Sequence, residues 1–387
     1  MARGTEKFVF ALGACAAACA MPASAAEWSV TPAFSWDADH STNRGLQPDA
    51  PESQSYGAVV DLQLARRDDT SEFRIQPHYR LARYLADRYP DADDKQLSMS
   101  GHWGYENAVL ELNALAAEES TLTTELAETG LVRADSNRRT IGGGLAWKYA
   151  AAETRQLSLS LGWQDVDYTG ARQDVLTGYR YLTASVGESF TLTPRAALLV
   201  TAFGSRLESP ERNSTSDERG ASLGVQYAWS ERTTMSLSLG LSKQDMDGRQ
   251  STGTTRDFSL DHKGERLDWS LGYSHSLQPY GTGVLAERDT AQLQFVRALG
   301  PRLDVLLSGR YARNQDGGFG FTFDSREYRF GESSLRWRVR ETWYASLSVG
   351  YSTARQEATW FTRASDAHGW TIGLNTRWTP RAIVIGH

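Results

Sequence analysis

The stretch that most limits what this chain can fold into lies at residues 219–243 and reads RGASLGVQYAWSERTTMSLSLGLSK. Apolar side chains take every second position on both sides of a polar turn at 230–233, and small polar side chains fill the positions between them. Such alternation predicts a β-hairpin with one apolar and one polar face. A soluble β-sandwich would share it, but strands of about 9 to 11 residues with aromatic ends and a Ser/Gly-rich polar face are typical of outer-membrane barrels.

The same hairpin pattern fills nearly all of the 387 residues, which predicts one domain. We count about eighteen strands, with about sixteen as the alternative. Short turns, as at 67–70 and 192–195, alternate with longer polar connections at 38–54, 85–95, 118–137 and 165–175. Outer-membrane barrels show this alternation because their short turns lie in the periplasm and their longer loops outside. The predicted fold class is therefore all-β: a transmembrane, antiparallel, up-and-down β-barrel in the cell outer membrane.

Hydropathy and strand pairing together favour a closed, wide barrel. A mean hydropathy of -0.48, without an apolar run of about 18 residues, excludes helical membrane spans. Aromatic residues at the strand ends suggest two interfacial girdles, with Trp343 beside a short turn and Trp36 toward a long loop. In lipid every strand edge must be paired, so the sheet has to close. Such a cylinder is wide enough for an aqueous channel unless loops fill it, and the connection at 118–137 is the best candidate plug on length alone.

The N-terminus has the features of an export signal. A short basic region, an apolar segment and the A-x-A site at 23–25 predict that residues 1–25 are a secretory signal peptide. Both cysteines, Cys15 and Cys19, lie inside this segment, so the mature chain needs no disulfide. A lipoprotein signal with lipid on Cys15 is the alternative, although the apolar stretch continues past that residue.

The C-terminus carries a second targeting feature. Residues 371–378 resemble the terminal signal read by the outer-membrane insertion machinery, with a polar residue, a glycine and the final aromatic Trp378. Thr376 departs from that pattern, and nine residues follow Trp378. We therefore divide the chain into a signal peptide at 1–25, a barrel at 26–378 and a C-terminal tail at 379–387. The expected partners are outer-membrane lipid and the insertion machinery.

The polar faces of the predicted strands carry both signs of charge. The formal net charge of -6 gives no support to nucleic-acid binding. The candidate lumen-lining cations are Arg74, His78, Arg80, Lys148, Arg310, Arg336, Arg338 and Arg377. They could form a basic stripe that steers an anionic sugar polymer, since charged rings set the preference of a pore. The alternative is a mixed-charge wall in which opposite charges pair across strands.

Two further predictions concern the placement of side chains on these faces. Arg336 and Arg338 share a face with Arg310 and Arg377, which belong to nearby strands, and we expect these four to form a local cluster. Catalysis would need a histidine beside a nucleophile. The one suggestive pair, His275 and Ser276, consists of strand neighbours, which point to opposite faces.

The sequence offers no other catalytic or metal-binding signal. His78 and His102 have lumen parity but no recognisable partner, and no residues show metal-ligand spacing. The glycines at 142–144 lie within a strand and no helix follows them, so they are not a phosphate loop. We therefore predict a non-enzymatic protein with no cofactor and no metal.

Two short motifs resemble a known family. The first has the pattern serine-leucine-x-proline-x-glycine-x-glycine before an Asp-starting strand, matched by Ser276, Leu277, Pro279, Gly281, Gly283 and Asp289. The second is a leucine-threonine-x-glutamate loop that runs into threonine-glycine and a basic pair, matched by Leu122, Thr123, Glu125, Thr129, Gly130, Arg138 and Arg139. Together they resemble the outer-membrane barrel family associated with PEP-CTERM/exosortase and exopolysaccharide gene systems. The likeness spans most of the mature chain and implies no catalytic residues.

Three functional hypotheses follow. The resemblance implies a non-enzymatic barrel that serves as a passage or platform for exported exopolysaccharide or surface protein, with the polymer or its export components as partners. The alternative is a general diffusion porin. The third is an outer-membrane lipid-modifying enzyme, which would need His275 in its site.

Overall fold

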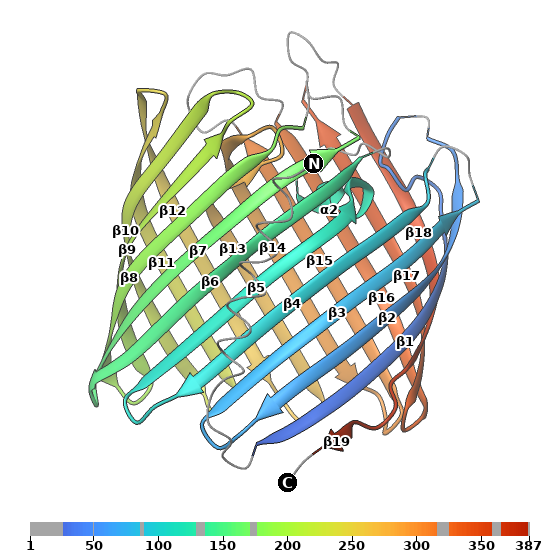
Figure 1. The fold of residues 1–387 in the computed structure, drawn as a ribbon, viewed down its shortest axis with the longest axis horizontal. Coiled ribbons are helices and arrows are strands. Elements are labelled where there is room, and N and C mark those ends of the chain that lie inside the picture. Colours follow the sequence, from blue (N-terminus) through green and yellow to red (C-terminus); the bar gives the residue numbers. More distant parts are fainter. Residues whose placement is uncertain are drawn as a thin grey trace.

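The computed structural model describes residues 26–48, 50–85, 89–128, 136–170, 176–315, 325–357 and 365–385. Within them, eighteen antiparallel strands follow one another in chain order, and β1 pairs with β18 to close the sheet into a barrel (Figure 1). The predicted fold class is confirmed. The predicted signal peptide at 1–25 lies outside the described residues.

The strands are long and tilted, and among the described residues one short helix interrupts them (Figure 1). Their bounds are Glu27–Ser41 (β1), Ser53–Arg67 (β2), Ser71–Tyr84 (β3), Ala92–Gly104 (β4), Ala108–Ser120 (β5), Asn137–Ala152 (β6), Arg155–Thr169 (β7), Tyr179–Thr193 (β8), Ala196–Ser209 (β9), Ser214–Ser230 (β10), Thr233–Met246 (β11), Arg249–Lys263 (β12), Leu267–Tyr280 (β13), Val284–Ala298 (β14), Leu303–Gln315 (β15), Arg326–Arg340 (β16), Trp343–Gln356 (β17) and Ser365–Trp378 (β18). Helix α2 is Thr121–Glu128. In the C-terminal tail, the short strand Ile383–Ile385 (β19) pairs with the start of β1.

Several strands extend beyond the predicted ends. β1 continues to Ser41 inside the predicted connection at 38–54, and β12 begins at Arg249, well before the apolar pattern resumes at Phe258. Hydrogen bonds between strands continue past the lipid boundary, where side chains on both faces are polar and the alternation that marks a strand disappears. As a result, β11 and β12 are joined by a tight turn at 247–248 rather than by a long loop.

Two ends of the barrel are therefore distinguishable. At the turn side, short connections such as 153–154 and 231–232 join the strands. At the loop side lie the longer connections at 42–52 and 121–136, together with three short ones between β9 and β14. The predicted alternation of short and long connections thus holds for most of the wall and fails in that sector.

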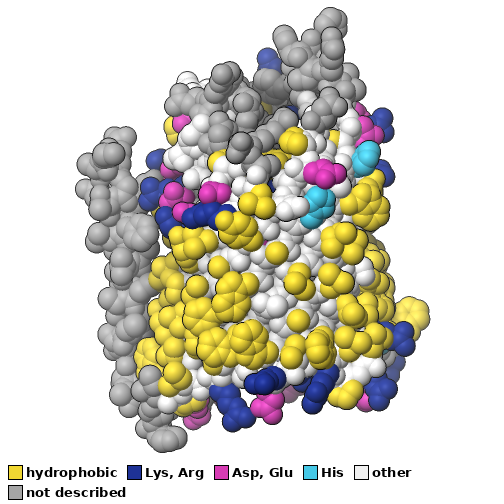
Figure 2. All heavy atoms as spheres, turned by 90° about the vertical axis from the view of Figure 1, so that its right-hand side faces the viewer, with side chains coloured by type: hydrophobic (Ala, Val, Ile, Leu, Met, Phe, Trp, Pro, Cys, Tyr) yellow, Lys and Arg dark blue, Asp and Glu magenta, His cyan; other side chains and the backbone are white. Residues whose placement is uncertain are grey.

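An apolar belt surrounds the wall. Leu223 on β10 lies opposite Leu239 on β11, and 57% and 55% of their surfaces are exposed to the surroundings of the barrel. Figure 2 shows a broad band of hydrophobic side chains on one face, with charged side chains gathered at its lower edge and above it. Because exposed apolar side chains on this scale are stable only in lipid, the belt marks the membrane-spanning zone. No helix within the described residues is long and apolar enough to cross a membrane.

The aromatic girdle at the turn side includes Trp36, which the sequence pattern places toward a long loop. Trp343, beside a short turn, stacks on Trp378 with ring centroids 6.2 Å apart and on Trp36 at 6.4 Å. The sequence placed Trp36 toward the long loops, so that assignment is wrong. Strand tilt is the reason, because it displaces neighbouring strands along the barrel axis and brings a mid-strand residue level with the end of another strand.

Candidate functional site

Two sectors of the lumen face differ in composition. We call the inner face of β7–β11 the hydroxyl wall, because serine, threonine, glutamine and glycine dominate it. Its strands are joined by side-chain hydrogen bonds between Ser160 and Ser185, at 2.7 Å, and between Ser236 and Ser259 of the next strand, β12, at 2.8 Å. We call the inner face of β15–β18 and β1–β6, which is continuous through the β1–β18 pair, the charged wall.

Ion pairs cross the charged wall from strand to strand. Asp61 accepts contacts from His78, at 2.6 Å, and from Arg377, at 3.6 Å. Arg80 lies 3.9 Å from Asp37 and 3.7 Å from Asp94. Two more pairs join neighbouring strands, Lys148 with Glu111 at 3.3 Å and Arg336 with Asp304 at 2.9 Å, and Arg74 pairs with Glu72 of its own strand at 2.7 Å. This arrangement is the mixed-charge wall rather than an uncompensated basic stripe.

The predicted arginine cluster forms only in part. Arg338 lies over the ring of Tyr344 at 5.7 Å, and Tyr344 pairs in register with both Arg338 and Arg377. Arg336 is two residues from Arg338 on the same face. Arg310 lies six residues along β15 from Asp304, the partner of Arg336, which is about 20 Å of strand. Arg310 is therefore not part of the cluster, because parity gives the face of a residue but not its height in the barrel.

At the loop side, one hairpin leaves the wall. Pairing between β12 and β13 ends at Arg256 and His275, although β13 continues to Tyr280. Pairing between β14 and β15 begins only at Glu287. The segment at 276–286, which we call the inward tip, has thus lost the strand neighbour on each side. It bends across the lumen toward β7–β9 (Figure 1).

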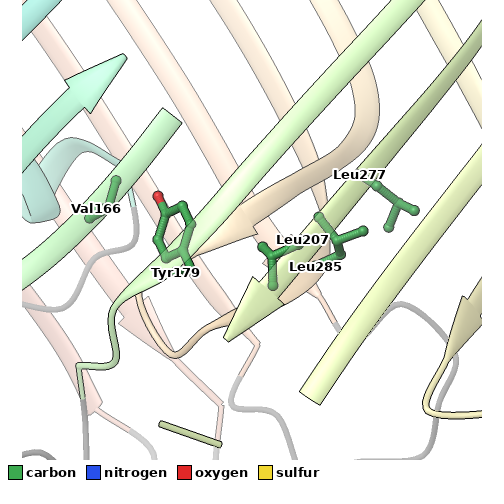
Figure 3. Close-up of a cluster of buried hydrophobic side chains, with 5 residues drawn as sticks. All are labelled: Val166, Tyr179, Leu207, Leu277 and Leu285. Atoms are coloured by element: carbon green, nitrogen blue, oxygen red, sulfur yellow. The ribbon is translucent and has the colours of Figure 1, made fainter. Parts of the chain in front are cut away.

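An apolar cluster holds the inward tip against the opposite wall. Leu277 and Leu285 from the tip pack with Val166, Tyr179 and Leu207, and each is at most 4% exposed (Figure 3). Both leucines lie on the side of the hairpin that faces lipid further down the strands. Because the tip has left the wall, that side now faces the inner surface of β7–β9.

A buried carboxylate anchors helix α2 at the same place. Glu125 is fully buried, and Tyr168 donates a hydrogen bond of 2.8 Å to its Oε1. The guanidinium of Arg138 lies 3.4 Å from the same oxygen and also donates to the hydroxyl of Tyr179, at 3.4 Å. A buried charge needs such partners to offset the loss of hydration. The predicted plug at 118–137 thus contributes α2 to the constriction, while its residues 129–135, including Thr129 and Gly130, lie outside the described residues.

Two glycines allow the inward tip to approach these groups. A methyl group on Gly281 would lie 3.0 Å from Leu176 and 3.1 Å from Glu125 Oε2. Gly283 has φ +75, and a methyl group there would lie 2.5 Å from the hydroxyl of Ser209. Only glycine adopts that backbone conformation readily and also fits in so little space, because it has no side chain. The two motifs of the family resemblance lie far apart in the chain, at 122–139 and 276–289, and meet inside the lumen.

A second segment narrows the other side of the mouth. Leu46, in the β1–β2 connection, packs on Tyr328 and Ala367 at the inner face of β16–β18. The backbone N–H of Gly45 donates to the hydroxyl of Tyr89, at 3.2 Å, which ties this connection to the one after β3. The loop-side opening is thus narrowed from two directions.

Burial along the barrel axis shows where the lumen is filled. The largest fully buried side chains of the described residues include Tyr280, Leu176, Leu207, Glu125 and Val166, which belong to the inward tip and its surroundings. Toward the turn side, by contrast, lumen-facing charged side chains are open to solvent: Lys148 is 45% exposed and Arg336 is 40% exposed. The barrel is therefore a water-accessible vestibule beneath a packed outer constriction.

The histidine considered for catalysis lies elsewhere. His275 Nδ1 is 2.9 Å from Asp289 Oδ1, which also accepts a hydrogen bond of 2.7 Å from the hydroxyl of Tyr273. Ser276 instead accepts a hydrogen bond from Gln278. The two residues thus have different partners, and the geometry offers no nucleophile activated by His275. Among the described residues, no group of three or more histidines, cysteines or acids is placed to hold a metal ion.

Fold, belt and lumen define an outer-membrane β-barrel with a polar, water-accessible interior. No protein-family model and no curated protein sequence matches the chain. Among solved structures it is similar to Acinetobacter baumannii OccAB2, with 12% identity and a TM-score of 0.47 over 92% of this chain and 98% of that one. Two Pseudomonas aeruginosa structures are similar over the same share of this chain: OpdO (14% identity, 97% of that chain, TM-score 0.47) and OccK2 (OpdF) in complex with glucuronate (11%, 98%, 0.47). The PEP-CTERM/exosortase association finds no support in these comparisons.

Proposed function

We propose that this chain is a passive outer-membrane channel for small polar solutes. The observation that carries the proposal is the contrast along the barrel axis: polar side chains are exposed to solvent in the turn-side lumen, and the largest fully buried side chains of the described residues gather at the loop-side constriction. A scaffold or plugged barrel would gain nothing from a hydrated interior lined by hydroxyls and paired charges. A diffusion channel needs such a lining, since a solute must exchange its hydration for similar contacts.

Export of polysaccharide or surface protein is less well supported. Its basis is the resemblance of two short motifs, and the residues of those motifs already have a packing role. Glu125 and Arg138 form a buried pair, and Gly281 and Gly283 allow the inward tip to approach it. A polymer would also have to pass the constriction that these residues build.

Planar-bilayer recording tests the proposal. The refolded barrel is expected to give ohmic channels whose conductance rises when the inward tip is shortened by replacing residues 277–285 with a two-residue Asn-Gly turn. The matched control replaces the exposed turn at 247–248 with the same two residues, which leaves the lumen unchanged. Absence of conductance in both the parent chain and the shortened variant, with heat-modifiable migration on gels showing that both are folded, would overturn the channel proposal.

Small solutes should pass with weak charge preference, because most of the predicted lumen cations are paired with acids. Liposome-swelling rates for neutral sugars of increasing size then measure the width of the constriction. A rate that is independent of sugar size would argue against a narrowed mouth.

A further inference from the structure

Three cations end the apolar belt on consecutive strands at the loop side. They are Arg219 on β10, Lys243 on β11 and Arg256 on β12. Each lies two residues along its strand, on the loop side, from an outward-facing apolar residue: Ala221, Leu241 and Phe258 respectively. All three side chains are exposed and share the outward face with the belt. These residues, which we call the cation row, flank the hairpin with the most exposed leucine, Leu241, at 71%.

The cation row differs from the rest of this boundary in its pairing. Elsewhere an outward-facing cation at the loop side has an acid beside it: Arg180 lies 3.6 Å from Asp165, and Arg83 lies 2.9 Å from Asp93. Arg219 and Lys243 instead face each other directly across the β10–β11 ladder. Within the described residues, none of the three cations forms an ion pair with a carboxylate.

Two like charges directly opposite each other destabilise an antiparallel pair. For Arg219 and Lys243 the nearest acids on the same face, Asp217 and Asp245, lie one pair further from the belt and also face each other. Beside Arg256 the next outward-facing residue is His275, which lies 2.9 Å from Asp289 on the strand beyond it. Asp217 is opposite Arg206 on β9, and Asp245 accepts hydrogen bonds from the turn at 248–250. Asp217 and Asp245 therefore do not lie between Arg219, Lys243 and the lipid, and Asp289 is bound by His275 and Tyr273. An anion at the edge of the belt would remove the repulsion within the cation row.

We propose that the cation row binds the phosphate groups of a phosphorylated glycolipid in the outer leaflet. The loop side of an outer-membrane barrel faces the exterior, so the lipid whose headgroup reaches this height belongs to that leaflet. Phosphate oxygens accept charge-assisted hydrogen bonds from guanidinium and ammonium groups. The exposed leucines directly below, Leu223 and Leu241, give the acyl chains of the same lipid an apolar surface.

Native mass spectrometry of the whole refolded chain in detergent tests this site with three probes: bisphosphorylated lipid A, the same lipid after dephosphorylation, and phosphatidylglycerol. The test variant is Arg219→Gln/Lys243→Gln/Arg256→Gln. The control, Arg195→Gln/Arg232→Gln/Arg302→Gln, removes the same charge from exposed turns at the opposite rim. Loss of three charge-assisted contacts should weaken lipid A binding about tenfold or more in the test variant only.

A stability measurement separates ligand binding from a structural role. In lipid-free detergent the test variant should melt no lower than the parent chain, because the substitutions remove repulsion. With lipid A added, the parent chain should gain thermal stability and the test variant should not. Equal lipid A binding by the parent and test variants would overturn the proposal, as would a loss of stability in lipid-free detergent. Binding of phosphatidylglycerol or dephosphorylated lipid A as tight as that of lipid A would overturn the assignment to a phosphorylated glycolipid.

Discussion

Two hairpins of this barrel share one sequence pattern and lie in different surroundings. β10–β11 stays in the wall over its whole length, and the outward side of its leucines faces lipid. β13–β14 begins in the same way, but beyond His275 and Glu287 its end bends into the lumen, where its leucines are buried against β7–β9. Alternation therefore determines which side chains share a face. Pairing with the neighbouring strands determines what that face touches.

The difference arises from the residues of the loop-side turns. At the loop side, β11 continues into β12 through a turn of Asp247 and Gly248, and nothing lies within 4 Å of a methyl group on that glycine. The inward tip uses Gly281 and Gly283, each close to groups from other strands. It also meets Glu125, a buried carboxylate supplied by α2. The position of the tip thus depends on partners far away in the chain.

The largest expected effect comes from removing that carboxylate. Glu125→Ala would leave Arg138 buried without its carboxylate, which costs about 3–5 kcal/mol where a buried ion pair is broken. Because α2 and the inward tip share this contact, the tip should open and single-channel conductance should rise. The control is Glu111→Ala at the solvent-exposed pair with Lys148, where the cost is about 0–1 kcal/mol. Equal effects of the two substitutions on melting temperature and conductance would contradict the anchoring role of Glu125.

The next largest expected difference in stability is between a leucine of the inward tip and a leucine of the apolar belt. Leu277→Ala removes a buried side chain and leaves a cavity, so we expect a loss of about 2–5 kcal/mol in the unfolding free energy. Leu223→Ala, at a position 57% exposed to lipid, should cost less because lipid chains fill the space. Urea unfolding in lipid vesicles, followed by tryptophan fluorescence, compares the two. If Leu223→Ala were the more destabilising, the inward tip would not be packed as described.

Much of the fold can be predicted from the sequence. The alternation at 219–243 and its repeats predict the faces, the antiparallel order and the number of strands, since each depends on a local pattern of period two. The sequence also singled out the motifs around Glu125 and Gly281. It could not indicate that they meet, because contact between α2 and β13–β14 depends on closure of the whole barrel.

The candidate site was predictable only in part. Parity placed Arg336 and Arg377 on one face correctly, but the height of Arg310 follows from strand tilt, which no local pattern contains. Leu277 has the parity of a lipid-facing residue and is buried in the lumen. A serine-proline-glycine run in place of a continued alternation was the one available signal that the hairpin changes course there.

Glycine substitutions give a smaller but more selective effect. Gly283→Ala and Gly248→Ala both place a side chain at positive φ, +75 and +84, and each should lose about 1 kcal/mol from backbone strain alone. Only at Gly283 does the new methyl group also meet Ser209, at 2.5 Å, so only this variant should displace the tip. Hydrogen exchange at the amides of Thr177 and Gly283 then measures the displacement. Protection that is equally reduced in both variants would indicate a general weakening of the barrel rather than a local one.

The smallest expected effect compares the two walls of the lumen. Arg336→Gln leaves the carboxylate of Asp304 without its cation on the charged wall, and this pair is partly exposed, so stability should change by only about 0–1 kcal/mol. The unpaired negative charge should nevertheless shift the reversal potential toward cation preference in a salt gradient. Ser236→Ala on the hydroxyl wall removes a neutral hydrogen bond to Ser259 and should leave the reversal potential unchanged. A shift of equal size in both variants, or a shift toward anions in Arg336→Gln, would mean that ions do not pass along the charged wall.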